Sequence, residues 1–248
     1  MASAVLTDSK AGDPIAEASP QIKAKIAGVF YLLNFVTGGI ALFAQRGLFV
    51  SGDAAATATN IVAHEPLFQL GVAAYLINVA CYIVVTLLFY DLFTRTNRSL
   101  SLLAAFFSIV GCAVQAFACS FQLATLSVLG GVQYLSVFKL EQVRALALMF
   151  LRLHTQAYNI GLVFFGFYCL LIGYLIFRSA FLPRMLGVLM AFAGLAWLTF
   201  LSPQLANTLS PYNRAVGVLG EGSLTLWLLA IGVNVRKWNE KATRVGVT

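Results

Sequence analysis

The sequence predicts an all-α, polytopic membrane protein, built as a bundle of six transmembrane helices. Of its 248 residues, 60% are hydrophobic and only 10% are charged, whereas soluble domains carry roughly 25% charged residues. Long apolar runs recur along the chain, several of them near the ~20 residues that a helix needs to cross a bilayer. Polar segments separate these runs. These observations favour a single polytopic domain over one or two soluble domains.

The N-terminal part is expected to contain a tail and the first span. Residues 1–21 are polar and rich in Ala and Ser, and are predicted to be a disordered cytoplasmic tail and not a signal peptide. The six-helix domain is predicted over residues 22–236, with its first helix over 26–44. In the loop that follows, Ser51 or Asp53 is expected to cap a short helix.

The middle of the chain predicts three further spans. The second covers residues 67–93, with Pro66 in its first turn. The third covers 100–128 and is longer than a bilayer requires. The fourth ends at Arg178 and is preceded by an amphipathic segment over 132–151. We therefore expect the third and fourth helices to extend beyond the membrane on its outer side.

The C-terminal part predicts the last two spans. They are expected over residues 183–201 and 215–235, joined by an irregular loop that contains Pro203 and Pro211. Residues 237–248 form a basic tail, expected in the cytoplasm.

The distribution of Lys and Arg predicts that both termini are cytoplasmic, because basic residues favour the cytoplasmic side of a membrane. Eleven of them fall on the side of the tails and of the second and fourth loops, and five on the other side. The eleven are Lys10, Lys23, Lys25, Arg95, Arg98, Arg178, Arg184, Arg236, Lys237, Lys241 and Arg244; the five are Arg46, Lys139, Arg144, Arg152 and Arg214. The net charge of +7 is explained in the same way. No basic stripe with interleaved aromatics is present, so nucleic-acid binding is not predicted.

Cysteines and aromatics are expected to serve packing. All four cysteines lie inside apolar runs without a C-x-x-C pattern, which is typical of small buried hydrophobes. They are Cys81, Cys112, Cys119 and Cys169. The 20 Phe, 9 Tyr and 3 Trp are mostly interpreted as lipid-facing groups and interface anchors.

Glu221 is the strongest single indication of a site. It lies six residues into the sixth predicted span, about 9 Å below its outer end at 1.5 Å per residue. A carboxylate at that depth costs several kcal/mol unless it is paired, protonated or hydrated. It is either part of a ligand site or the partner of Arg46, Arg152 or Arg214 in an ion pair.

A second group of polar residues lies on the fourth span. Arg152, Gln156 and Asn159 are spaced to share one helix face, and His154 lies beside them. This face either lines an outer cavity opposite Glu221 or is a polar helix end at the membrane surface.

The third group precedes the second span. Asn60, His64 and Glu65 are interpreted either as a cap of that helix or as part of the same site. A metal ion held by His64, Glu65, His154 and Glu221 is a weaker hypothesis, because no local spacing such as H-E-x-x-H supports it. The sequence identifies neither catalytic residues nor a cofactor.

Three runs carry a resemblance to a known family. They read KIAGVFYLLNFVTGG, GDAAATATNIVAHEPLFQLG and LRLHTQAYNIGLVFFGFYCLLIGYLIFRSAFLPRMLGVLM. With them the chain resembles, over about residues 22–235, the bacterial membrane family called domain of unknown function 4386. The resemblance implies a multi-pass protein of the bacterial inner membrane and implies no activity.

The leading functional hypothesis is a protein that binds a small molecule or lipid in a polar cavity in the outer half of the bundle, with transport of that ligand as one form of it. The alternatives are an intramembrane enzyme, in one version metal-dependent, and a structural or assembly protein without a ligand. The bilayer is the predicted partner, and a homo-oligomer is compatible with the sequence.

Overall fold

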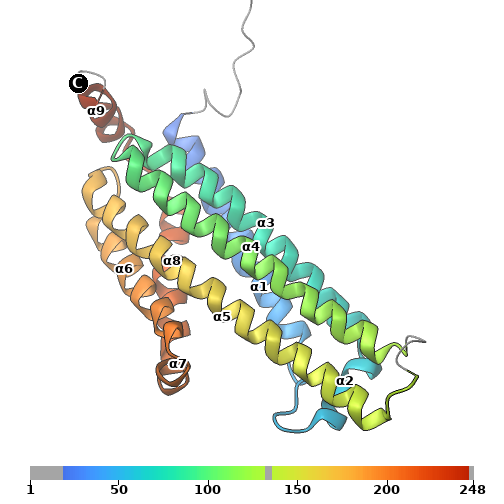
Figure 1. Ribbon diagram of the computed structural model, residues 1–248. Coiled ribbons are helices and arrows are strands. Elements are labelled where there is room, and N and C mark those ends of the chain that lie inside the picture. The colour runs from blue at the N-terminus through green and yellow to red at the C-terminus, as the bar shows by residue number, and fades with distance from the viewer. Residues whose placement is uncertain (1–18, 132–135, 246–248) are drawn as a thin grey trace, which may run out of the picture.

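The computed structural model describes residues 19–131 and 136–245, with side chains up to residue 240, and its elements are all helical (Figure 1). They are α1 (Pro20–Ala44), α2 (Ala54–Ala63), α3 (Glu65–Thr94), α4 (Arg98–Leu129), α5 (Leu140–Ser179), α6 (Arg184–Leu198) with the 3₁₀ turn η2 (Thr199–Leu201), α7 (Pro203–Leu209), α8 (Tyr212–Ala230) and α9 (Val235–Val245). No strand occurs in these ranges, so the prediction of an all-α protein is confirmed.

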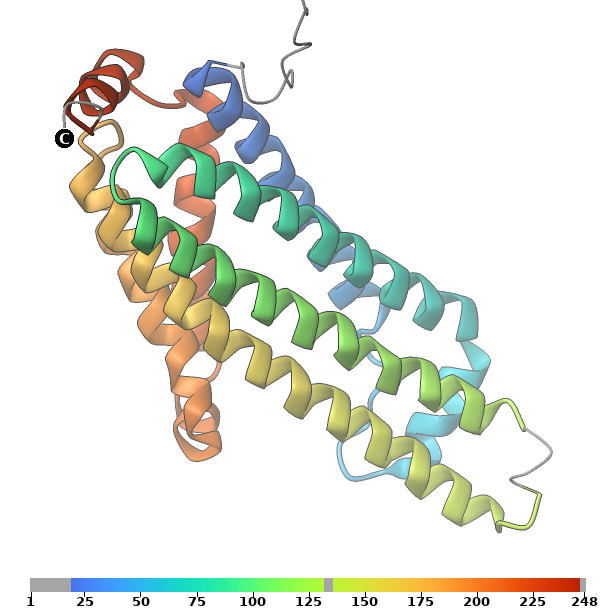
Figure 2. The same cartoon turned by 45° about the horizontal axis from the view of Figure 1, so that its top comes forward.

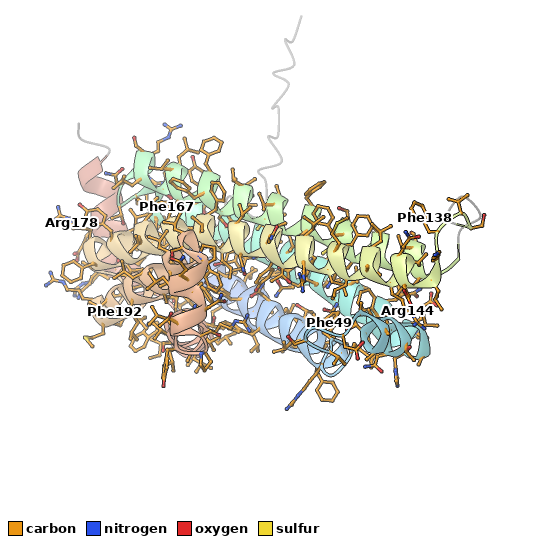
Figure 3. All side chains as sticks on the ribbon, turned by 60° about the horizontal axis from the view of Figure 1, so that its bottom comes forward. Phe49, Phe138, Arg144, Phe167, Arg178 and Phe192 are labelled. Atoms are coloured by element: carbon orange, nitrogen blue, oxygen red, sulfur yellow. The ribbon has the colours of Figure 1, made fainter. Side chains whose placement is uncertain are left out.

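Five helices among the described residues are long and apolar enough to cross a membrane: α1, α3, α4, α5 and α6 extended by η2. The sixth predicted span corresponds to α8, which is not among these five. Large apolar side chains cover the outside of the bundle, such as Phe106, which is 61% exposed, and Phe192, which is 56% exposed (Figure 3). Because water would penalise such a surface, these faces are suited to contact with lipid.

The helices of the bundle form a closed ring, in which each packs against the next in the order α1, α3, α4, α5, α6, α8 and back to α1 (Figures 1 and 2). The long helices α3, α4 and α5 run side by side, while α6 and α8 are shorter. The short helix α2 packs against α5.

Glycines bring α5, α6 and α8 close together. A Cβ added to Gly173 of α5 would lie 2.7 Å from the carbonyl oxygen of Gly187 in α6. A Cβ added to Gly220 of α8 would lie 2.6 Å from the carbonyl oxygen of Leu189 in α6. Such small-residue contacts let membrane helices approach at backbone distance. They hold α8 directly against α6, and this places the side chain of Glu221 inside the ring.

The start of α1 and the C-terminal helix lie at the same end of the bundle (Figure 1). The Gln21 side chain donates to the carbonyl oxygen of Ile231 (2.8 Å) and accepts from the backbone N–H of Val233 (2.9 Å). Trp238 of α9 donates from Nε1 to the carbonyl oxygen of Leu92 at 3.1 Å. The start of α1 is therefore joined to the segment between α8 and α9, and α9 is joined to the end of α3.

The structure decides between the two predicted caps of α2 and adds a helix, α7, that the sequence does not predict. Asp53, and not Ser51, caps α2, because it accepts a 2.8 Å hydrogen bond from the backbone N–H of Ala56. The loop expected to be irregular contains α7 instead. Its prolines predict irregular structure, yet Pro203 occupies the first turn behind the cap residue Ser202, where proline is favoured.

Helix ends differ from the predictions at three further places. Residues 1–18 of the predicted tail lie outside the described residues, and α1 already begins at Pro20. The last predicted span stops at Ala230, because Gly232 adopts a positive φ of 78° that ends the helix. The predicted basic tail begins inside α9.

Candidate functional site

A cavity of about 870 Å³ lies inside the ring of helices. Its wall combines aromatic rings with many polar side chains and three charged ones, Arg46, Arg214 and Glu221. The uncharged polar residues that line it are Asn34, Gln45, Asn78, Gln115, Gln122, Thr155 and Asn159, together with His154 and the hydroxyl-bearing Tyr75, Tyr82 and Tyr158. A volume of this size is typical of sites for small molecules, which fill roughly 300–1,000 Å³.

Glu221 forms one end of the cavity and is held by neutral hydrogen-bond donors. Its Oε2 accepts from the hydroxyls of Tyr31 at 2.8 Å and Tyr82 at 3.2 Å, and its Oε1 accepts from Trp197 Nε1 at 2.8 Å. The Cys169 thiol is a weaker donor, 3.9 Å from Oε1. We call Tyr31, Tyr82, Trp197 and Cys169 the carboxylate cage.

The cage replaces the ion pair that was one of the sequence-based expectations. Glu221 is only 8% exposed, yet none of the arginines in the described residues lies within ion-pair distance of it. Hydrogen bonds to an ionised carboxylate are about twice as strong as bonds between neutral groups. Three strong donors therefore offset much of the loss of hydration without any neutralising cation.

The cage residues come from four helices, and close contacts between these helices bring the side chains together. Gly217 lies directly under the indole of Trp197, where a Cβ would come within 2.1 Å of the ring. The glycine thus allows α8 to approach the ring closely enough for Trp197 to reach Glu221. On the other side, the rings of Tyr31 and Tyr82 meet edge to face with centroids 5.5 Å apart, and their hydroxyls lie 3.2 Å from each other.

The opposite end of the cavity opens between α1 and α8. The two helices meet at Gly28 and Leu229 and again at Tyr31 and Glu221, and then diverge (Figure 2). Leu42 of α1, which is 72% exposed, and Val218 of α8, which is 51% exposed, line the cavity there. We call this gap the side opening. Its apolar rim lies on the outside of the bundle, where lipid is expected.

The middle of the cavity is organised by amide groups. Asn34 and Asn78 each donate from Nδ2 to the backbone carbonyl of the other, at 3.1 and 2.6 Å, and this pair ties α1 to α3. Gln122 donates to Gln45 Oε1 at 3.0 Å, and its own Oε1 is buried without a hydrogen-bond partner. Such an orphan acceptor in a cavity wall is a ready position for a ligand donor.

Of the predicted site residues, three line the cavity: Glu221, His154 and Asn159. The remaining members of the predicted row on the fourth span, Arg152 and Gln156, are exposed and do not line it. Arg152 and Gln156 do not line the cavity because the side of α5 that faces it is the neighbouring one, which carries His154 and Tyr158.

The third predicted group stays at the junction of α2 and α3. Asn60 donates to the carbonyl oxygen of Gly47 at 3.4 Å, and Nδ1 of His64 lies 3.0 Å from the carbonyl oxygen of Asn60. Glu65 accepts from Gln69 at 2.9 Å. These contacts are local, and His64 occupies the cap position of α3 but makes no side-chain cap hydrogen bond there.

The metal hypothesis gains no geometric support. Throughout the described ranges, no three His, Cys, Asp or Glu side chains are grouped closely enough to hold a metal ion. His64 and Glu65 are exposed at the α2–α3 junction, whereas His154 and Glu221 line the cavity.

The cage residues are not evident from the sequence, in which aromatics and cysteines within apolar runs are typical of packing. The available signal is the hydroxyl of Tyr31 and of Tyr82, each in the middle of an apolar run. A buried tyrosine hydroxyl needs a hydrogen-bond partner. Glu221 is the only buried carboxylate among the residues that the structure describes, but nothing local in the sequence links it to either tyrosine.

The closed ring of apolar helices and its inner cavity define an α-helical, multi-pass membrane protein with a pocket open to one side. The chain belongs to the family of domain of unknown function 4386, whose model matches residues 26–232, and this confirms the resemblance. Comparison with curated proteins and with solved structures gives no match.

Proposed function

We propose that this protein binds a small molecule or lipid in its cavity. The observation that carries the proposal is the combination of about 870 Å³ of space with a caged carboxylate at one end and an opening at the other. A protein that used Glu221 only to fasten helices together would not need the space beside it. Mixed aromatic and polar walls are typical of ligand sites.

The proposed orientation follows from the basic residues. We infer that α8 crosses the membrane as a sixth span and that both termini are cytoplasmic, in the bacterial inner membrane. At 1.5 Å per residue, α8 is about 28 Å long, close to the ~30 Å hydrocarbon thickness. In this orientation the side opening lies in the outer half of the membrane. The 40 residues of α5 and the 32 of α4 then extend beyond the bilayer on the outer side.

Transport of the same ligand would require a second conformation, in which the carboxylate cage opens toward the cytoplasmic end. Binding requires only the conformation described above, and it is therefore the function that the geometry supports best.

The test uses two glycines that differ only in their relation to the cavity. Gly39 lines the cavity and Gly222 does not, and at both positions an added Cβ would meet no atom within 4 Å. The wild type, Gly39→Trp and Gly222→Trp proteins would be purified in nanodiscs and examined by native mass spectrometry for bound small molecules. We expect wild type and Gly222→Trp to carry the same bound mass and Gly39→Trp to lose it. Equal retention in all three, or no bound mass in any of them, would contradict the proposal.

A further inference from the structure

The lining of the cavity presents several hydrogen-bond acceptors. Glu221 contributes its carboxylate, and Gln122 contributes the buried Oε1 that has no partner. His154 contributes a third acceptor. Its Nδ1 lies 3.0 Å from the carbonyl oxygen of Ala118, which can only accept, so Nδ1 carries the hydrogen. In neutral imidazole the other nitrogen, Nε2, is then an acceptor. A ligand that satisfies these groups must carry O–H or N–H donors.

Arginines in the lining present the opposite chemistry. Arg46 lies just after α1, next to Gln45, which accepts from Gln122, whereas Arg214 lies in the first turn of α8, the helix that carries Glu221. Neither guanidinium has a hydrogen bond or ion pair to another described residue. Guanidinium groups bind phosphate and carboxylate through paired N–H donors. Arg214 therefore favours an anionic group in the part of the cavity next to Glu221.

Arg214 and Glu221 are close enough for one ligand molecule to contact both. Arg214 and Glu221 are seven residues apart on α8, which is about two helical turns and roughly 10 Å along the axis. Both therefore face the same side of the helix. An arginine side chain bending inward and a short polar head group together cover this distance.

We propose that the ligand is an anionic molecule with a donor-bearing end: a phosphate or carboxylate bound by Arg214, joined by a short linker to hydroxyl or ammonium groups that reach Glu221. This proposal rests on the proposed function and names the chemical class of its ligand. Such chemistry occurs in phospholipid head groups and in small soluble phosphate esters. In a lipid, the acyl chains leave through the side opening past Leu42 and Val218 into the bilayer.

The test compares head groups that share a phosphate but differ in donors. Phosphatidylethanolamine has N–H donors and phosphatidylglycerol has hydroxyls, whereas the choline group of phosphatidylcholine has neither. Each lipid, with identical acyl chains, would be titrated into delipidated protein in detergent and its apparent affinity measured by native mass spectrometry. We expect phosphatidylcholine to bind at least tenfold more weakly than the other two. Soluble phosphoethanolamine and glycerol phosphate, tested in parallel, separate a soluble source from a lipid source.

Variants test the anion-binding end. Arg214→Gln is expected to weaken binding of the preferred probe at least tenfold, and Arg214→Lys to restore part of it. Arg144→Gln is the matched control, because Arg144 lies on α5 outside the cavity lining (Figure 3). It should leave the affinity unchanged.

The outcomes separate this inference from the proposed function. Equal affinity for all three lipids, or unchanged affinity in Arg214→Gln, overturns the assigned ligand chemistry. If none of the five probes binds while the wild type still carries a bound mass that Gly39→Trp loses, the cavity site stands and the ligand class is wrong. If the probes bind equally well to Gly39→Trp, they bind outside the cavity, and both proposals fail.

Discussion

Tyr31 and Glu221 lie 190 residues apart in the sequence and are joined by a 2.8 Å hydrogen bond between the tyrosine hydroxyl and the carboxylate. This bond closes the ring of helices, because it connects the first helix to the last one of the bundle. It also fixes the carboxylate at the end of the cavity. The same contact therefore contributes to the closure of the bundle and to the shape of the proposed binding site.

Glu221→Gln is expected to destabilise the protein. The amide keeps one acceptor oxygen but replaces the other with an NH₂ group, which would face a donor of the cage. Leaving a buried polar group unsatisfied costs about 1–3 kcal/mol. Thermal unfolding of the detergent-solubilised protein should show a lower midpoint for Glu221→Gln. Glu65→Gln, at an exposed position, is the matched control. If both variants keep the wild-type midpoint, the carboxylate cage does not stabilise the fold.

Tyr31→Phe should be more harmful than Tyr82→Phe. Both variants remove a hydroxyl that donates to the same oxygen, but Tyr31 is at 2.8 Å and Tyr82 at 3.2 Å. Loss of the closer donor is expected to cost about 1–2 kcal/mol. A double-mutant cycle of Tyr31→Phe with Glu221→Gln would measure the coupling directly. Additive effects would argue against a functional hydrogen bond between the two side chains.

The parts of the structure that depend on neighbouring residues could be predicted from the sequence. The apolar runs located the bundle helices, and the cap at Asp53 was identified from local spacing. The depth of Glu221 in its helix was also enough to single it out. Each of these features is determined by a few consecutive residues and by the length of a bilayer.

The composition of the site could not be predicted, because it depends on which helices pack together. Tyr82 is 139 residues from Glu221 in the sequence, and Trp197 reaches the carboxylate because Gly217 leaves room for its indole. The exclusion of Arg152 from the cavity has a similar origin. A helix face can be defined from spacing, but the rotation of that face toward the core is set by the partners of the helix.

Gly173→Leu should separate α5 from α6 and destabilise the bundle. A Cβ at this position would lie 2.7 Å from the carbonyl oxygen of Gly187, and this is a backbone atom that cannot rotate away. The helices must move apart, which costs typically 1–3 kcal/mol or more for overpacking. The same substitution at Gly222, where a Cβ meets nothing within 4 Å, should be tolerated. Comparable melting midpoints for the two variants would mean that the close approach of α5 and α6 is not needed.

The proposed orientation predicts which loops are reached from outside the cell. Val137, 82% exposed in the segment between α4 and α5, should lie on the outer side, and Arg95, in the turn between α3 and α4, on the cytoplasmic side. The four native cysteines are all buried, so they give a low background for thiol labelling. In intact cells, a membrane-impermeant maleimide should label Val137→Cys and not Arg95→Cys, and both should react once the membrane is opened.

The reverse labelling pattern would place the side opening in the cytoplasmic half, and the ligand would then enter from the inner leaflet. Labelling of both positions in intact cells would contradict a single crossing of the membrane by α4, because the two loops flank this helix and must then face opposite sides.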